Sequence, residues 1–153
     1  MPVDEVNGAR IYWEAHGNGE PVLLLHGFTG SGEDWAGTVA QWSSDFRLIV
    51  PDLRGHGRSG TLERPFRHDD AAADLLALLD RLNVTACRGV GISGGGNVLL
   101  HMAVRQPERT KALVLVSATP YFPAQARAIM RQYGSSLSAE QHESLRLRHR
   151  QEG

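Results

Sequence analysis

The stretch RGVGISGGGNVLLH, residues 88–101, fits two glycine patterns that imply unrelated chemistry. Its segment GVGISG, residues 89–94, matches G-x-G-x-x-G, the pattern that holds the pyrophosphate of a dinucleotide. The overlapping segment GISGG, residues 91–95, matches G-x-S-x-G, which presents a serine, here Ser93, on a turn between a strand and a helix. The rest of the chain has to decide between a phosphate site and a nucleophile.

The sequence around the turn argues against a nucleotide. A dinucleotide fingerprint normally follows the first strand and has an acidic residue about 20 positions later, at the end of the next strand. Here the turn follows the third parallel strand that we predict, and the next strand ends LVLVSA, residues 113–118, without an acid. A phosphate-binding loop is excluded because no Lys-Ser or Lys-Thr pair follows Gly94.

A serine turn explains the same glycines sterically. Where a strand runs directly into a helix, side chains two positions before and after the turn residue would collide, and these positions are Gly91 and Gly95. Three consecutive glycines at 94–96 would each weaken a helix by about 1 kcal/mol relative to alanine, so they indicate that close approach is required. We therefore expect Ser93 in a strained conformation, with its Oγ exposed above the sheet.

Composition predicts one ordinary domain with a packed core. The 153 residues are 41% hydrophobic and 22% charged, with a formal net charge of −1. This balance creates no field that would attract nucleic acid or an anionic membrane, so neither is expected as a partner. No apolar run approaches the roughly 20 residues that span a bilayer, and the start MPVDEVNGAR lacks the order of a secretory signal, which favours a cytoplasmic location. A single cysteine, Cys87, excludes a disulfide or a cysteine-based zinc site within the chain.

Strands and helices alternate along the chain. An antiparallel N-terminal hairpin, turning at Asn7-Gly8, is followed by the repeated units of an α/β fold, with a mostly parallel sheet and helices on both faces. We divide the chain into residues 1–119, the sheet-containing core, and residues 120–153, a helical segment that begins after Pro120. Strands are expected at 3–6, 10–17, 21–27, 46–52, 86–92 and 111–117, and helices at 32–42, 69–82, 94–106, 122–133 and 138–150.

Three motifs in order point to one family. LLLHGFTGSGEDW (residues 23–35), PDLRGHGRS (51–59) and GISGGGN (91–97) together resemble the α/β-hydrolase family, in particular its esterase-like branch with a lid over the site. The resemblance runs from Val3 to the lid-like helix at 122–133 and implies an α/β-hydrolase fold, here incomplete.

The resemblance also assigns roles to individual residues. Ser93 matches the family's nucleophile, and the backbone N–H groups of Phe28 and Gly94 match its oxyanion hole. The family's dehalogenases and epoxide hydrolases carry aspartate at the nucleophile position, so the serine argues against those branches. Four further residues match structural supports of the site: His26, Gly27, Gly91 and Gly95.

Several other polar and aromatic residues receive structural interpretations. His26 is expected to support the oxyanion loop rather than to transfer protons. His101, within the helix after the serine, is expected to be packed or capped. Bracing of a loop is expected for Asp52, Arg54 and His56, packing for Trp35 and Trp42, and a solvated helix end for Arg146, Arg148 and Arg150.

The partners that a catalytic serine needs have no matching positions. In this family the chain order is serine, then Asp or Glu, then His, yet Ala118, Thr119 and Pro120 follow the strand where the acid belongs. The later candidates all fall on the terminal helical segment: Glu140, His142, Glu143, His149 and Glu152. We therefore expect the N-terminal half of an α/β hydrolase that ends inside the lid, either as a fragment or as a naturally shortened chain.

Two classes of function remain open. The first is a serine hydrolase that acts on a carboxylic ester or related small acyl substrate through an acyl-enzyme, with no metal or other cofactor; lactonase, carbon–carbon hydrolase and cofactor-free perhydrolase activities would use the same serine. The second is a non-catalytic binding or assembly module. In either case the isolated chain is expected to show little sustained turnover, and the apolar edge of strand 111–117 is open to self-association.

Overall fold

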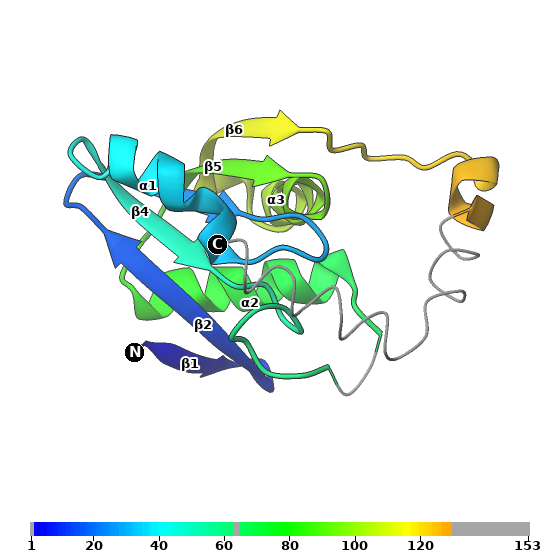
Figure 1. The fold of residues 1–153 in the computed structure, drawn as a ribbon, viewed down its shortest axis with the longest axis horizontal. Coiled ribbons are helices and arrows are strands. Elements are labelled where there is room, and N and C mark those ends of the chain that lie inside the picture. Colours follow the sequence, from blue (N-terminus) through cyan, green and yellow to red (C-terminus); the bar gives the residue numbers. More distant parts are fainter. Residues whose placement is uncertain (1, 63–64, 130–153) are drawn as a thin grey trace. The chain divides into compact units, whose positions relative to one another are not determined.

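The computed structural model describes residues 2–62 and 65–129 (Figure 1). The chain divides into two units, residues 1–118 and 119–153. Of the second unit, the described part contains a short helical segment at 124–129, within the helix predicted over 122–133. The helix predicted over 138–150 lies outside the described residues.

The first unit is built on a six-stranded sheet with the order β1-β2-β4-β3-β5-β6. Strands β3 to β6 run parallel, while β1 pairs antiparallel with β2, and β2 pairs antiparallel with β4. This arrangement confirms the predicted fold class. The bounds are Val3–Val6 for β1, Ala9–His16 for β2, Glu20–Leu25 for β3, Phe46–Pro51 for β4, Cys87–Ile92 for β5 and Thr110–Val116 for β6.

The predicted hairpin forms at its expected turn. Asn7 and Gly8 both have positive φ, 49° and 74°, which two-residue hairpin turns require and which asparagine and glycine adopt most readily. The turn aligns Val6 of β1 with Ala9 of β2.

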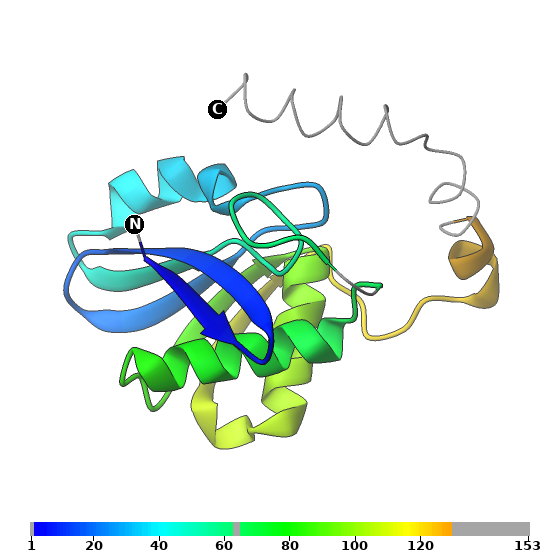
Figure 2. The ribbon, with the colours of Figure 1, turned by 90° about the horizontal axis from the view of Figure 1, so that it is seen from below.

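Helices cover both faces of the sheet, as Figure 2 shows: α1 (Ala36–Trp42) lies on one face, and α2 (His68–Arg81) and α3 (Gly94–Arg105) lie on the other. Two apolar cores result, because parallel strands are buried on both sides. The larger core is formed by α2, α3 and the sheet, and Trp35 packs in the smaller one beside α1. No helix in the described part of the chain is both long and apolar enough to cross a bilayer.

The predicted helix over 32–42 is divided in two. It starts as a 3-10 turn, η1 (Gly32–Trp35), and continues as α1, while a second 3-10 turn, η2 (Pro107–Arg109), leads into β6. Ser31 closes the start of η1 with a capping box, since its Oγ accepts the Glu33 N–H at 3.3 Å and its own N–H donates to Asp34. Trp42, at the end of α1, is 38% exposed and packs edge-on against Phe46.

Candidate active site

Ser93 occupies the turn between β5 and α3 and has φ +49° and ψ −115°. Such a positive φ is unfavourable for a residue with a Cβ atom. The backbone on both sides holds the conformation: the Ser93 N–H donates to Val116 O at 2.8 Å, and its carbonyl accepts the Asn97 N–H at 3.1 Å. The residue is exposed, and its side chain makes no capping hydrogen bond to the start of α3.

The two glycines of the serine pattern are required for different close approaches. A Cβ atom at Gly91 would lie 2.7 Å from Gly96 N and 2.8 Å from Gly95 C, so β5 and the first turn of α3 touch there. A Cβ atom at Gly95 would lie 2.5 Å from the carbonyl oxygens of Leu25 and His26. The collision predicted at Gly95 is therefore real, but it involves the end of the neighbouring strand β3.

The loop after β3 lies beside the serine. A Cβ atom at Gly27 would be 3.5 Å from Ser93 Cβ, and the Phe28 ring lies 3.1 Å from the position that a Cβ atom at Gly94 would take. The structure thus brings together Gly27, Phe28, Ser93 and Gly94, whose roles were predicted from two separate motifs. The backbone of this loop and the start of α3 flank Ser93.

His26 is wholly buried, and both of its ring nitrogens are occupied. The Leu53 N–H donates to Nε2 at 2.9 Å, and Nδ1 lies 2.7 Å from Gly27 O. Since an amide N–H can only donate and a carbonyl can only accept, the ring is neutral with its proton on Nδ1. Burial lowers the pKa of His26, which reinforces this state. The ring joins the loops after β3 and β4 and has no nitrogen available to a serine proton.

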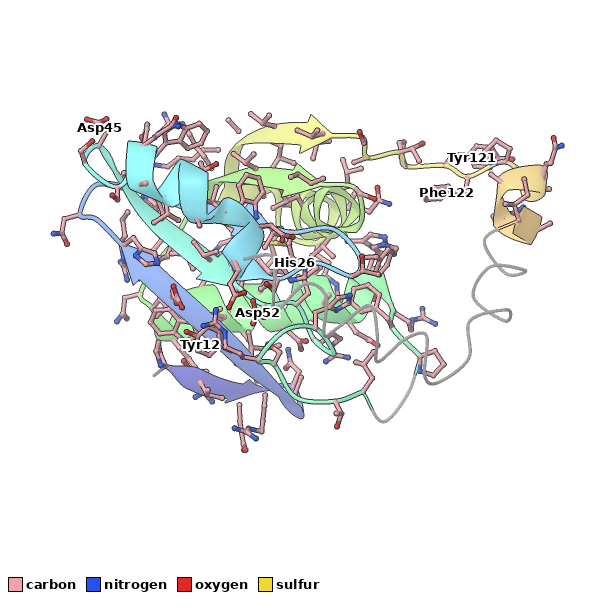
Figure 3. All side chains as sticks on the ribbon, viewed as in Figure 1. Tyr12, His26, Asp45, Asp52, Tyr121 and Phe122 are labelled. Carbon is pink, nitrogen blue, oxygen red and sulfur yellow. The ribbon has the colours of Figure 1, made fainter. Side chains whose placement is uncertain are left out.

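The loop after β4 is held by buried polar groups. Asp52 is wholly buried and accepts the N–H groups of Gly32 and Arg58, each at 2.6 Å. Arg54 forms a bidentate pair with Asp74 of α2, at 2.6 and 2.9 Å. Bracing is thus confirmed for Asp52 and Arg54, and Figure 3 shows His26 and Asp52 in the interior of the first unit. Burial raises the pKa of the Asp74 carboxyl despite its arginine partner.

A group of aromatic rings that was not predicted from the sequence lies beside the serine turn. The ring of Phe28 lies 5.1 Å from Phe66, 5.5 Å from His68 and 5.9 Å from His56, measured between ring centres. His101 stacks on His68 at 5.9 Å, but its side chain is 47% exposed, so the predicted packing is limited to this ring contact. No periodic pattern marks this group, because Phe66 precedes α2 and the rings come from four separate segments.

Other catalytic groups are not assembled around Ser93 in the described residues. None of their histidines or carboxylates hydrogen-bonds to the serine, and no group of three or more of their His, Cys, Asp or Glu side chains could hold a metal ion. The late candidates named from the sequence, Glu140, His142, Glu143, His149 and Glu152, lie outside the described residues.

The parallel sheet, the serine turn after the internal strand β5 and the glycine loop beside it define an α/β hydrolase. A family model described as alpha/beta hydrolase fold matches residues 20–140, and the chain belongs to this family.

Individual relatives cover the same part of the chain. It is 38% identical over 125 residues to a pimeloyl-[acyl-carrier protein] methyl ester esterase of Nitrosomonas europaea, covering 77% of this chain and 45% of the relative. It is 36% identical over 118 residues to a non-heme chloroperoxidase of Streptomyces lividans, covering 74% and 43%. The chain thus spans less than half the length of these two relatives.

A solved structure agrees with the fold. The thermophilic esterase from Thermogutta terrifontis, in its malate-bound form, superposes with a TM-score of 0.82 and 28% sequence identity. The match covers 91% of this chain and 52% of the esterase.

Proposed function

We propose that Ser93 is the nucleophile of a hydrolase that cleaves a carboxylic ester or a related small acyl compound through an acyl-enzyme. The observation that carries this proposal is the exposed serine at φ +49°, at the end of a parallel strand that is paired on both sides and beside the loop after β3. A strained, exposed residue held by glycine contacts on both sides is costly to build and serves no packing role.

The chemistry follows from the groups around Ser93. Its Oγ would attack the ester carbonyl and lose its proton to a base, and the alcohol would then leave with a proton, which yields the acyl-enzyme. The N–H groups of Phe28 and Gly94 would stabilise the developing oxyanion, and losing one such donor typically costs about 2.7 to 4 kcal/mol of barrier stabilisation. Water would attack the acyl-enzyme, releasing the acid and restoring the serine.

The base is the element of the reaction that the described residues do not supply. His26 is neutral and donates from Nδ1 to Gly27 O, so it is unsuited to the role. We therefore propose that the 153-residue chain by itself has little sustained turnover, because among the described residues no base is positioned beside Ser93 to remove its proton or to activate the deacylating water. Removal of triad members in a serine protease still leaves about 10³ to 10⁴-fold catalysis over water, so a weak residual activity is compatible.

The relatives favour an ester as substrate, because both the Nitrosomonas protein and the Thermogutta protein are named as esterases. The chloroperoxidase relative supports one second candidate, a cofactor-free perhydrolase that uses the same serine. Hydrolysis of p-nitrophenyl esters and lactones, compared with peracid formation from acetate and peroxide, separates these activities. In each case the proposed partner is a small acyl compound, without nucleic acid, membrane or cofactor.

A fluorophosphonate probe tests the nucleophile directly. We expect slow labelling of the purified chain, with the modified peptide containing Ser93, and no labelling of that peptide in Ser93→Ala. Ser44→Ala, which removes an exposed serine bonded to Asp45, should label like the wild type. Equal labelling of wild type and Ser93→Ala would exclude Ser93 as the nucleophile, and a folded chain that resists the probe would favour a non-catalytic binding module.

Steady-state kinetics tests the proposed weak turnover. The chain and Ser93→Ala should both release p-nitrophenol from a short-chain ester at rates far below the typical enzyme median of about 10 s⁻¹. Sustained turnover near that value, lost in Ser93→Ala, would contradict the proposal and would direct attention to His142 and His149 as the base.

A further inference from the structure

The side chain of Phe28 lies against the first residue of α3. Its ring carbons Cδ2 and Cε2 are each 3.1 Å from the position that a Cβ atom at Gly94 would take. Gly94 stands between Ser93 and Gly95, at a position where the serine pattern itself accepts any residue. The absence of a side chain at Gly94 therefore leaves the space that the Phe28 ring occupies.

Two further rings hold Phe28 in this position. The Phe66 ring meets it edge-on, with the ring centres 5.1 Å apart and the planes at 81°, and the His68 ring does so at 5.5 Å and 65°. Phe66 and His68 also meet edge-on, at 5.4 Å. Edge-to-face contacts of this kind are favourable between aromatic rings, so the three side chains support one another.

His68 belongs to this group as an uncharged ring. Its Nε2 atom is buried and has no hydrogen-bond partner in the described part of the chain. Burial lowers the pKa of His68, and the neighbouring His101 lowers it further. Since the ordinary histidine pKa is about 6.5, the ring is neutral at pH 7. The rings of Phe28, Phe66 and His68 therefore form an apolar surface without a charge.

The contact between Phe28 and Gly94 lies next to the reacting atoms of the proposed hydrolysis. The N–H groups that we propose for the oxyanion hole belong to these same two residues, and a carbonyl oxygen bound there places its carbon atom beside the Ser93 Oγ. Because the Phe28 ring lies against Gly94, it is adjacent to the groups attached to that carbon. The acyl group is the one that remains attached in both steps of the reaction.

We propose that the Phe28 ring binds the acyl group of the substrate, and that the substrates are esters with an apolar acyl chain of several carbon atoms. Phe66 and His68 are positioning residues, which hold the ring against Gly94. The proposal rests on the proposed role of Ser93 as nucleophile. An acetyl group is too short to extend across a phenyl ring, whereas a hexanoyl chain can do so.

Acylation of Ser93 by p-nitrophenyl hexanoate and p-nitrophenyl acetate tests the proposal. The rate constant for each ester is measured on the purified chain from the mass of the modified Ser93 peptide, with Ser93→Ala as the blank. We expect the wild type to favour hexanoate, and we expect Phe28→Ala to lower the hexanoate-to-acetate ratio by about 10-fold, the lower end of what one methylene contributes in an apolar pocket. Trp42→Ala removes a ring of similar exposure, 38% against 45% for Phe28, and should leave the ratio unchanged.

The positioning role of Phe66 is tested by the same ratio. Phe66→Ala should lower the ratio, and Phe66→Tyr, which keeps the ring, should restore it. A purely structural effect would lower both acylation rates together and leave the ratio unchanged. If Phe66→Ala does not fold, Gly94→Ala supplies a second measurement, because its Cβ atom needs the space of the Phe28 ring and should lower the ratio by displacing that ring.

The outcomes separate this proposal from the proposed function. Acylation of Ser93 by both esters with a ratio that is the same in the wild type and Phe28→Ala, or that falls equally in Trp42→Ala, would overturn the acyl-binding role and leave the nucleophile intact. A wild type that favours acetate would do the same. Absence of Ser93 acylation by either ester, in a chain that also resists the fluorophosphonate probe, would overturn both proposals.

Discussion

The turn after β5 and the loop after β4 lie at the same end of the sheet, but their conformations are held by opposite means. In the turn after β5, Gly91 and Gly95 have no side chains, so backbone segments contact each other directly. Ser93 between them is held at a positive φ. The loop after β4 buries polar side chains, and Asp52 and Arg54 hold it through hydrogen bonds.

This difference separates the residues that strain the fold from those that stabilise it. An exposed serine at φ +49° contributes little packing and costs conformational energy. The buried Arg54–Asp74 pair has its hydrogen bonds satisfied. Removal of one partner would be strongly destabilising, because it leaves the other charge buried and uncompensated. Replacement of Ser93 by glycine should therefore raise the free energy of unfolding, whereas loss of the Arg54 side chain should lower it.

The largest effect is expected at the buried pair. Arg54→Met leaves Asp74 buried without its bidentate partner and should lower the free energy of unfolding by about 3–5 kcal/mol, measured by urea denaturation. Arg105→Met removes a bidentate pair of similar geometry with Asp69, but this pair is exposed and screened by water, so the loss should be much smaller than in Arg54→Met. Adding Asp74→Leu to Arg54→Met should recover much of the loss, and equal losses in both arginine variants would contradict the comparison.

A close second is the glycine that faces β3. Gly95→Ala places a Cβ atom 2.5 Å from two carbonyl oxygens and should destabilise the protein by about 1–3 kcal/mol, with loss of probe labelling at Ser93. Gly37→Ala is the matched control, because a Cβ atom there meets nothing within 4 Å in the helix α1. Gly37→Ala should raise the free energy of unfolding by about 0.5–1 kcal/mol. A Gly95→Ala variant as stable as the wild type would show that the turn can accommodate a Cβ atom at this position.

Acid should weaken the link between the two loops. Burial lowers the pKa of His26 in the folded state, so below the ordinary histidine pKa of about 6.5 the unfolded chain binds a proton that the folded chain does not. The contribution of His26 to the free energy of unfolding is therefore fully present above about pH 6.5. It declines as the pH falls toward the lowered pKa of the folded state, by up to about 1.4 kcal/mol per pH unit for one proton. His26→Gln should flatten this decline more than His68→Gln, since burial lowers the pKa of His68 too but that ring is less buried.

The smallest effect tests the strain at the serine itself. Ser93→Gly accepts a positive φ without a Cβ penalty and should raise the free energy of unfolding by about 0.5–1 kcal/mol while abolishing probe labelling. Ser93→Ala keeps the Cβ atom and should abolish labelling without the gain. A destabilised glycine variant would mean that the Ser93 side chain supports the fold.

Local pattern was enough to predict the serine turn and the elements around it. The spacing of Gly91, Ser93 and Gly95 indicates a steric requirement between residues that are close in the sequence. The alternation of apolar strands with amphipathic helices indicates a sheet that is buried on both faces. The antiparallel hairpin followed from Asn7-Gly8 for the same reason, because its backbone preference is local.

Long-range contacts were decided by the tertiary structure alone. The sequence did not specify the order β1-β2-β4-β3-β5-β6, the ring group around Phe28, or that Gly95 faces β3. The Leu53 amide reaches His26 across 27 positions, and Arg54 reaches Asp74 across 20. Periodicity and turn chemistry describe neighbours along the chain, whereas these partners meet only after the strands have paired, so their geometry depends on the assembled sheet.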